Sequence, residues 1–198
     1  MNDMYISSRR ITSHIGAMSA VYGVTGVLPA NARILELGCG NAQLLLTHAL
    51  AWPESECVGI DLDAQTIANA EEKRQQLGVK NVSLYALGLD SLVNIEAGTF
   101  DYIIINGIFS LLPETERAVL LAFASRSLTP NGIVAMRWNS LPGSRDAKSI
   151  QDAIALHTAD ATDDEMTLNS ARAMIIYLEM AQQPGRIINS VLSSADRK

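Results

Sequence analysis

Short, mostly apolar segments alternate along the chain with longer segments in which apolar residues recur at helical spacing. The short segments are typical of strands covered on both faces: Arg33–Leu37, Cys57–Ile60, Val82–Ala86, Tyr102–Asn106 and Ile133–Trp138. The longer segments predict helices: Ile11–Tyr22, Asn41–Trp52, Ala64–Leu77 and Pro113–Leu128. This alternation predicts an α/β fold, a Rossmann-like and mostly parallel sheet with helices on both faces.

The pattern changes towards the C-terminus. Ile150–His157 and Glu165–Gln182 predict helices, and only Arg186–Leu192 still has the character of a strand. We therefore expect a Rossmann-like domain over residues 1–145, with reduced C-terminal edge strands. A helical extension over residues 146–198 is expected to pack on the same domain.

Composition and charge exclude several classes of protein. A chain of 198 residues that is 48% apolar can bury one sizeable core. Its net charge of −6 argues against a broad nucleic-acid-binding face, which needs clustered lysine and arginine. No apolar segment is long enough to span a bilayer, and the start of the chain does not resemble a secretory signal. Cys39 and Cys57 have no paired spacing, so we expect a cytoplasmic protein without a structural metal site.

A glycine-rich turn follows the first predicted strand and precedes a helix. Gly38 and Gly40 form a Gly-x-Gly turn, but Gln43 stands where the dinucleotide fingerprint has its third glycine. Glu36, just before the turn, would repel a pyrophosphate and suits a cationic group. Asp61 ends the second strand about 20 residues later, where a carboxylate can accept hydrogen bonds from ribose hydroxyls. The combination predicts an adenosine ligand with a cationic group.

Structural roles remain open for these acidic residues. Glu36 could cap the neighbouring helix, and Asp61 could cap the helix that begins near Ala64. The loop Leu87–Asp90 follows the third strand and would flank the adenine, where Asp90 is as easily a ligand contact as a surface residue.

The sequence resembles a known family at these motifs. ILELGCG and VGIDLD are similar to class I S-adenosylmethionine-dependent methyltransferases. Phe100–Pro113, Leu128–Gly143 and Ala171–Ala181 resemble bacterial members that carry a C-terminal methyltransferase regulatory domain, although no segment matching that domain is found. The resemblance implies that S-adenosyl-L-methionine is bound at four loops. The predicted cofactor-binding residues are Glu36, Leu37, Gly38, Cys39, Gly40, Asn41, Asp61, Leu62, Gly88, Leu89, Asn106, Gly107 and Ile108.

This chain differs from the family at some residues that are expected to face the methyl acceptor. Members usually have a histidine where this chain has Asn106, and a tyrosine where it has Trp138. Methyl transfer from a sulfonium mainly requires alignment of acceptor, methyl and sulfur. The candidates for orienting the acceptor are Asn106, Asn139 and His14. Equally, the asparagines could cap strand ends and His14 could be a surface residue.

Other residues have weaker claims to a functional role. Cys39 is interpreted as a packing residue, because no histidine lies near it in the sequence. Arg137 and Arg145 are candidates for binding an acidic acceptor, although single surface arginines are usually only solvated.

Three functions are compatible with these features. The first is methyl transfer by an enzyme to a small molecule or a protein side chain. The second is a cofactor-binding regulatory or interaction module with little or no turnover, which would pair with a second copy or a partner protein through the C-terminal helices. The third is a dinucleotide or nucleotide-sugar enzyme, which Gln43 and Glu36 both disfavour. The methyl acceptor cannot be read from the residues.

Overall fold

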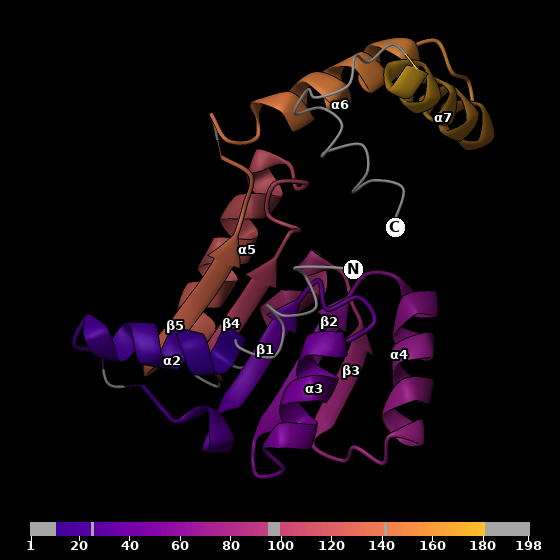
Figure 1. The fold of residues 1–198 in the computed structure, drawn as a ribbon. Helices are drawn as coiled ribbons and strands as arrows, with labels where there is room; N and C mark the ends of the chain where they lie inside the picture. Colours follow the sequence, from indigo (N-terminus) through magenta and orange to yellow (C-terminus); the bar gives the residue numbers. More distant parts are fainter. Residues whose placement is uncertain (1–10, 25, 95–99, 141, 181–198) are drawn as a thin grey trace. The chain divides into compact units, whose positions relative to one another are not determined.

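A five-stranded parallel sheet forms the centre of the first of two compact units, residues 1–138 and 139–198. The computed structural model describes residues 11–24, 26–94, 100–140 and 142–180. The strands are β1 (Arg33–Leu37), β2 (Glu56–Asp61), β3 (Val82–Ala86), β4 (Phe100–Asn106) and β5 (Leu128–Arg137). Their order is β3-β2-β1-β4-β5, and all four neighbouring pairs are parallel (Figure 1). The predicted fold class is therefore confirmed.

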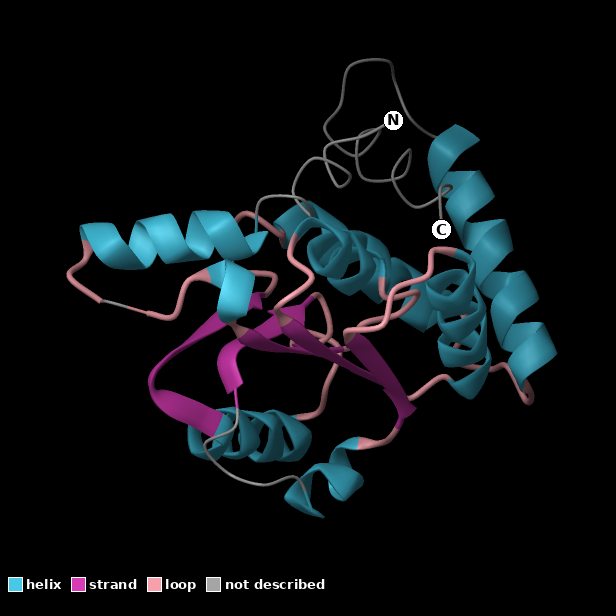
Figure 2. Cartoon of the chain, turned by 90° about the horizontal axis from the view of Figure 1, so that it is seen from below, coloured by secondary structure: helices cyan, strands magenta, loops and turns pink. Residues whose placement is uncertain are grey.

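Helices cover both faces of the sheet (Figure 2). One face packs against α2 (Ile11–Val21), α3 (Gln43–Ala51) and α4 (Ala64–Gln76). The other packs against α5 (Glu114–Ser127) and the 3-10 helix η2 (Leu89–Asn94). A short 3-10 helix, η1 (Pro29–Asn31), precedes β1.

Alternation along each strand assigns its side chains to these two faces. In β1, Ile34 belongs to the core under α3 and Leu35 to the core under α5. Glu36 therefore lies on the α3 face, because successive side chains of a strand point to opposite sides. A strand with an apolar core on both sides must be apolar throughout, and this explains why β1 and β4 show no polar alternation.

Two element boundaries differ from the predicted ones. β5 begins at Leu128, five residues before the predicted strand Ile133–Trp138. An irregularity lies inside it, where the register moves from Phe100 opposite Leu128 to Tyr102 opposite Ile133. Pro130 is tolerated there because β5 is an edge strand of the described sheet and needs no amide donor on its outer side.

The start of α3 is the second difference. Asn41 does not cap this helix. The capping position is occupied by Ala42, which has a left-handed φ of 52° and is fully buried, while the Asn41 side chain accepts the amide of Gln43 at 3.3 Å. The helix predicted from Asn41 therefore begins two residues later, and a buried small residue stands where a polar capping side chain is common.

The described residues of the second unit form the helices α6 (Arg145–His157) and α7 (Asp164–Met180), which pack on each other. The predicted strand Arg186–Leu192 lies outside the described residues. Among the described helices, none is both long and apolar enough to cross a bilayer.

At Gly59 in the sheet, even a methyl group would be too large. A Cβ atom on Gly59, in β2, would lie 2.7 Å from Leu84 Cδ2 and 2.9 Å from both Cys39 Sγ and Leu45 Cδ1. Gly59 thus lets α3 and the glycine-rich turn approach the sheet.

We predict that Gly59→Ala lowers the free energy of unfolding by about 1–3 kcal/mol, the usual cost of overpacking a core. Urea denaturation of the variant and the parent measures this loss. Ser83→Ala, at an exposed position of the neighbouring β3, is the control and should change stability by less than about 0.5 kcal/mol. Equal stability of the two variants would contradict the packing argument.

Candidate functional site

The turn after β1 is held against the end of β2 by its backbone. The amides of Gly38 and Cys39 donate to the Ile60 carbonyl at 2.8 and 3.1 Å, and the Gly40 amide donates to Asp61 Oδ2 at 2.8 Å. Gly38 and Gly40 have φ values of +73° and +51°, which glycine adopts without strain. The turn is therefore a fixed backbone surface between the two strands.

This turn meets the loop after β4 at the point where the strand order reverses. β1 lies between β2 and β4, so the connections that leave β1 and β4 run to opposite faces and open a crevice at the carboxyl ends of the strands. A Cβ atom on Gly38 would lie 2.4 Å from Ile108 Cγ2, which shows how closely the two loops approach.

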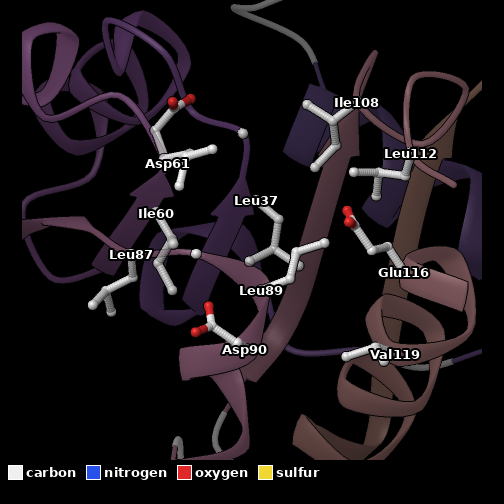
Figure 3. A pocket seen from close by; sticks show the side chains of 13 residues that line it. Leu37, Ile60, Asp61, Leu87, Leu89, Asp90, Ile108, Leu112, Glu116 and Val119 are labelled. Carbon is white, nitrogen blue, oxygen red and sulfur yellow. The ribbon is translucent and has the colours of Figure 1, made fainter.

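A cavity of about 540 Å³ opens beside this crevice (Figure 3). It has the size of a small-molecule site and is lined mainly by apolar side chains. It brings together seven of the residues predicted to bind the cofactor: Leu37, Gly38, Asp61, Leu62, Gly88, Leu89 and Ile108. Asp90, which the sequence placed beside the adenine without deciding its role, also lines it.

Sequence reasoning missed part of the lining. Ile60 and Leu87 lie next to predicted residues, but Leu112, Glu116 and Val119 come from α5 and the turn before it. These three follow a spacing of four and then three residues, which places them on one side of the helix. That spacing was the available signal, but only the packing of α5 against the sheet shows that this side faces the cavity, as Figure 3 shows for Glu116.

Glu36 is a buried carboxyl group with an unsatisfied oxygen. Its side chain is 4% exposed, and Oε2 has no hydrogen-bond partner among the described residues. Burial, and secondarily the negative charge of Asp61, raises the pKa of Glu36 to about 8. A positively charged group bound next to Glu36 would supply the missing partner and favour the ionised form.

Asp61 and Asp63 have separate roles in the structure. The two oxygens of Asp61 accept the amides of Gly40 and Asp63, at 2.8 and 3.0 Å. The cap of α4 is Asp63, which accepts the amide of Gln65 at 2.9 Å and the hydroxyl of Thr66 at 2.5 Å. The alternative in which Asp61 caps α4 is therefore wrong, and Glu36 does not cap α3 either, since the capping position is Ala42 and no side chain caps this helix.

A smaller cavity, of about 140 Å³, lies at the carboxyl ends of β4 and β5. It brings His14 of α2 together with Asn106 of β4, two of the three residues predicted to orient an acceptor. Ile15, Arg137 and apolar residues of the two strands complete it. Asn139, the third candidate, belongs to the second unit, and its role stays a prediction.

The remaining predicted residues line neither cavity. Cys39 is buried, and burial, followed by the charges of Glu36 and Asp61, raises the pKa of its thiol to about 12, so the thiol is protonated at neutral pH. This agrees with a packing role. Gly40 lies half-buried in the turn, while Asn41 and Gly107 are exposed. Within the described parts of the chain, no three His, Cys, Asp or Glu side chains are grouped so that they could hold a metal ion.

Known proteins resemble this chain in sequence and structure. A family model described as a methyltransferase domain matches residues 28–187. An uncharacterised protein of Rickettsia prowazekii (strain Madrid E) is 28% identical over 166 residues, which cover 84% of this chain and 30% of that protein. A ubiquinone biosynthesis O-methyltransferase of Methylococcus capsulatus is 28% identical over 105 residues, which cover 53% of this chain and 42% of that protein.

A solved structure resembles nearly the whole chain. PKMT2 from Rickettsia typhi, in complex with AdoHcy, matches with a TM-score of 0.72 and 25% sequence identity. The match covers 96% of this chain and 36% of the PKMT2 chain. The chain thus spans less than half the length of each of these three proteins.

We predict that Glu36→Gln stabilises the protein by an amount that grows as the pH rises from about 5 to 8. Between the ordinary pKa of 4.5 and the folded value of about 8, the folded protein holds a proton on Glu36 that the unfolded chain releases. The parent therefore loses stability with rising pH, by at most about 1.4 kcal/mol per pH unit, and levels off above pH 8. Glutamine at this position removes that loss.

Urea unfolding at several pH values measures the difference between the variant and the parent. Glu54→Gln, at an exposed position, is the matched control and should show a small difference that does not change with pH. A pH-independent difference for Glu36→Gln would show that this carboxyl group is ionised in the folded protein at pH 7.

Proposed function

The chain belongs to the methyltransferase domain family, as its sequence predicts, and from this we propose that it binds S-adenosyl-L-methionine and transfers the methyl group to a small molecule or a protein side chain. The observation that carries the proposal is the buried Glu36 carboxyl group, which has an oxygen without a partner and lies on β1 just before the glycine-rich turn. S-adenosylmethionine has two cationic groups, an amino group and a sulfonium. The narrower resemblance to members with a regulatory domain stays a prediction.

The residues present fit this cofactor. The large apolar cavity suits the adenosine, with Asp61 as acceptor for the ribose hydroxyls and Asp90 near the adenine. Glu36 suits the amino group of the methionine part, and Gly38 keeps the backbone close to the ligand. A phosphate-containing ligand is disfavoured, because Asp61, Asp90 and Glu116 all line the cavity, while no lysine or arginine among the described residues does so.

The chemistry required of the protein is mostly positioning. When bound, the cofactor supplies a methyl group on a positively charged sulfur, which leaves as a neutral thioether. Asn106 and His14 line the small cavity, where they can hold an acceptor by hydrogen bonds. His14 can also take a proton from an acceptor that is not yet deprotonated. Alignment of the reacting groups supplies much of the rate enhancement in such a site.

Three further expectations accompany this proposal. A cytoplasmic location is supported by the two buried, unpaired thiols of Cys39 and Cys57. The helical character of the extension over residues 146–198 is supported by the pairing of α6 with α7, and its packing on the Rossmann-like domain stays an expectation. A dimer or partner protein at these helices is supported by their exposed apolar side chains, among them Leu156, Ile176 and Met180.

We predict that Asp61→Asn weakens the binding of S-adenosylmethionine by at least about 10-fold, because hydrogen bonds from the ribose to a charged acceptor are lost. Asp63→Asn is the matched control: it lies two residues away and caps α4, so it should change the affinity less than twofold. Titration calorimetry of both variants and the parent measures the effect.

The same titrations test the function itself. The parent should bind S-adenosylmethionine more tightly than NAD, and preferential binding of NAD would overturn the proposal. Mass spectrometry of ligand that co-purifies with the protein then separates an enzyme from a binding module. Adenosylhomocysteine, the product, would support turnover, whereas S-adenosylmethionine alone would support the regulatory or interaction module.

A further inference from the structure

We propose that the acceptor of this chain carries a carboxylate group, which is bound in the small cavity by Arg137 with help from His14 and Asn106. This inference rests on the proposed function, since it names the chemical class of the molecule that receives the methyl group. It concerns the side of the site formed by α2, β4 and β5, where the cavity of about 140 Å³ lies.

The strand register brings Arg137 and Asn106 side by side. β4 and β5 are parallel, and Asn106 is paired with Arg137 in the same way as Ile104 is paired with Ala135. Paired residues of neighbouring strands point to the same face of a sheet. Tyr102 and Ile104 belong to the core beneath α2 and α3, so Asn106 and Arg137 lie on that face as well.

α2 supplies the third polar group. Ile15 packs against the core on this face, and His14 precedes it and lines the cavity together with Asn106 and Arg137. The three polar side chains therefore come from three different elements and meet at one cavity. Its other lining residues, Ile15, Ile104, Ile105, Ala135 and Met136, are apolar.

The charge of this cavity is uncompensated. The described part of its lining contains Arg137 but no aspartate or glutamate. Among the residues that the structure describes, Arg137 forms no ion pair or side-chain hydrogen bond. A guanidinium group presents its donors as a planar fork that matches a carboxylate, and the Asn106 amide and a histidine ring add neutral donors. A carboxylate is a small planar group that can accept hydrogen bonds from all three.

The position of this cavity separates it from the part of the site that suits a cation. Glu36 is paired with Ile104, one strand away, while Arg137 lies on β5, two strands from β1. Two strand spacings are about 10 Å. The amino and carboxylate groups of the cofactor are attached to the same carbon atom, so a cofactor whose amino group is held by Glu36 leaves Arg137 for a different molecule.

The test uses the full chain saturated with adenosylhomocysteine. Its probes are three acids, each compared with the matched amide. Acetate, benzoate and succinate are compared with acetamide, benzamide and succinamide by ligand-observed NMR. At least one acid should bind at least 10-fold more tightly than its amide. Arg137→Gln should weaken that binding at least 10-fold, Arg137→Lys should weaken it less, and both should bind adenosylhomocysteine within twofold of the parent.

The control is Lys80→Gln, which removes one exposed positive charge from the loop before β3 and should leave binding of the acids unchanged. Equal binding of acids and amides, or no binding of any acid to the loaded protein, would overturn the inference. So would a 10-fold loss of adenosylhomocysteine affinity in Arg137→Gln, because Arg137 would then bind the carboxylate of the cofactor. If the parent does not bind adenosylhomocysteine, the proposed function fails first and this inference fails with it.

Discussion

Three backbone amides hold the turn after β1 to the last two residues of β2, and the arrangement of the whole site depends on these hydrogen bonds. They fix the turn at the carboxyl end of a parallel sheet, where the connections of β1 and β4 diverge. The hydrogen bond from the Gly40 amide uses one oxygen of Asp61 and so orients this carboxylate at the edge of the large cavity. A local backbone feature thereby determines which side chains can meet a ligand.

The two sides of the site differ in charge. Glu36 and Asp61 lie near the carboxyl ends of β1 and β2, and Asp90 follows β3, while Arg137 ends β5. The acidic part suits a cationic ligand, and the burial of Glu36 makes the free site costly, because a carboxyl group without a partner for Oε2 lies among apolar residues. A bound cation is attracted more strongly to such a buried carboxylate than to an exposed one.

Much of the fold and part of the site could be predicted from the sequence because they depend on local patterns. The strands β1 and β4 are apolar throughout, and the glycine-rich turn lies directly between a strand and a helix. Glu116 and Val119 could not be assigned in this way, because their position in the cavity results from the packing of α5 against the sheet. The cap of α4 is different: Asp63 directly precedes Ala64 and accepts hydrogen bonds from Gln65 and Thr66, so a local signal for Asp63 was present in the sequence although Asp61 was considered instead.

The contact between Gly38 and Ile108 joins two segments that are far apart in the chain. Because a Cβ atom on Gly38 would lie 2.4 Å from Ile108 Cγ2, the turn after β1 and the loop after β4 cannot change independently. Since Gly38 also has a φ of +73°, a larger residue at 38 would be strained even beside a smaller residue at 108. Position 38 is therefore expected to stay glycine over evolution, and the room beside it limits the size and placement of the side chain at 108.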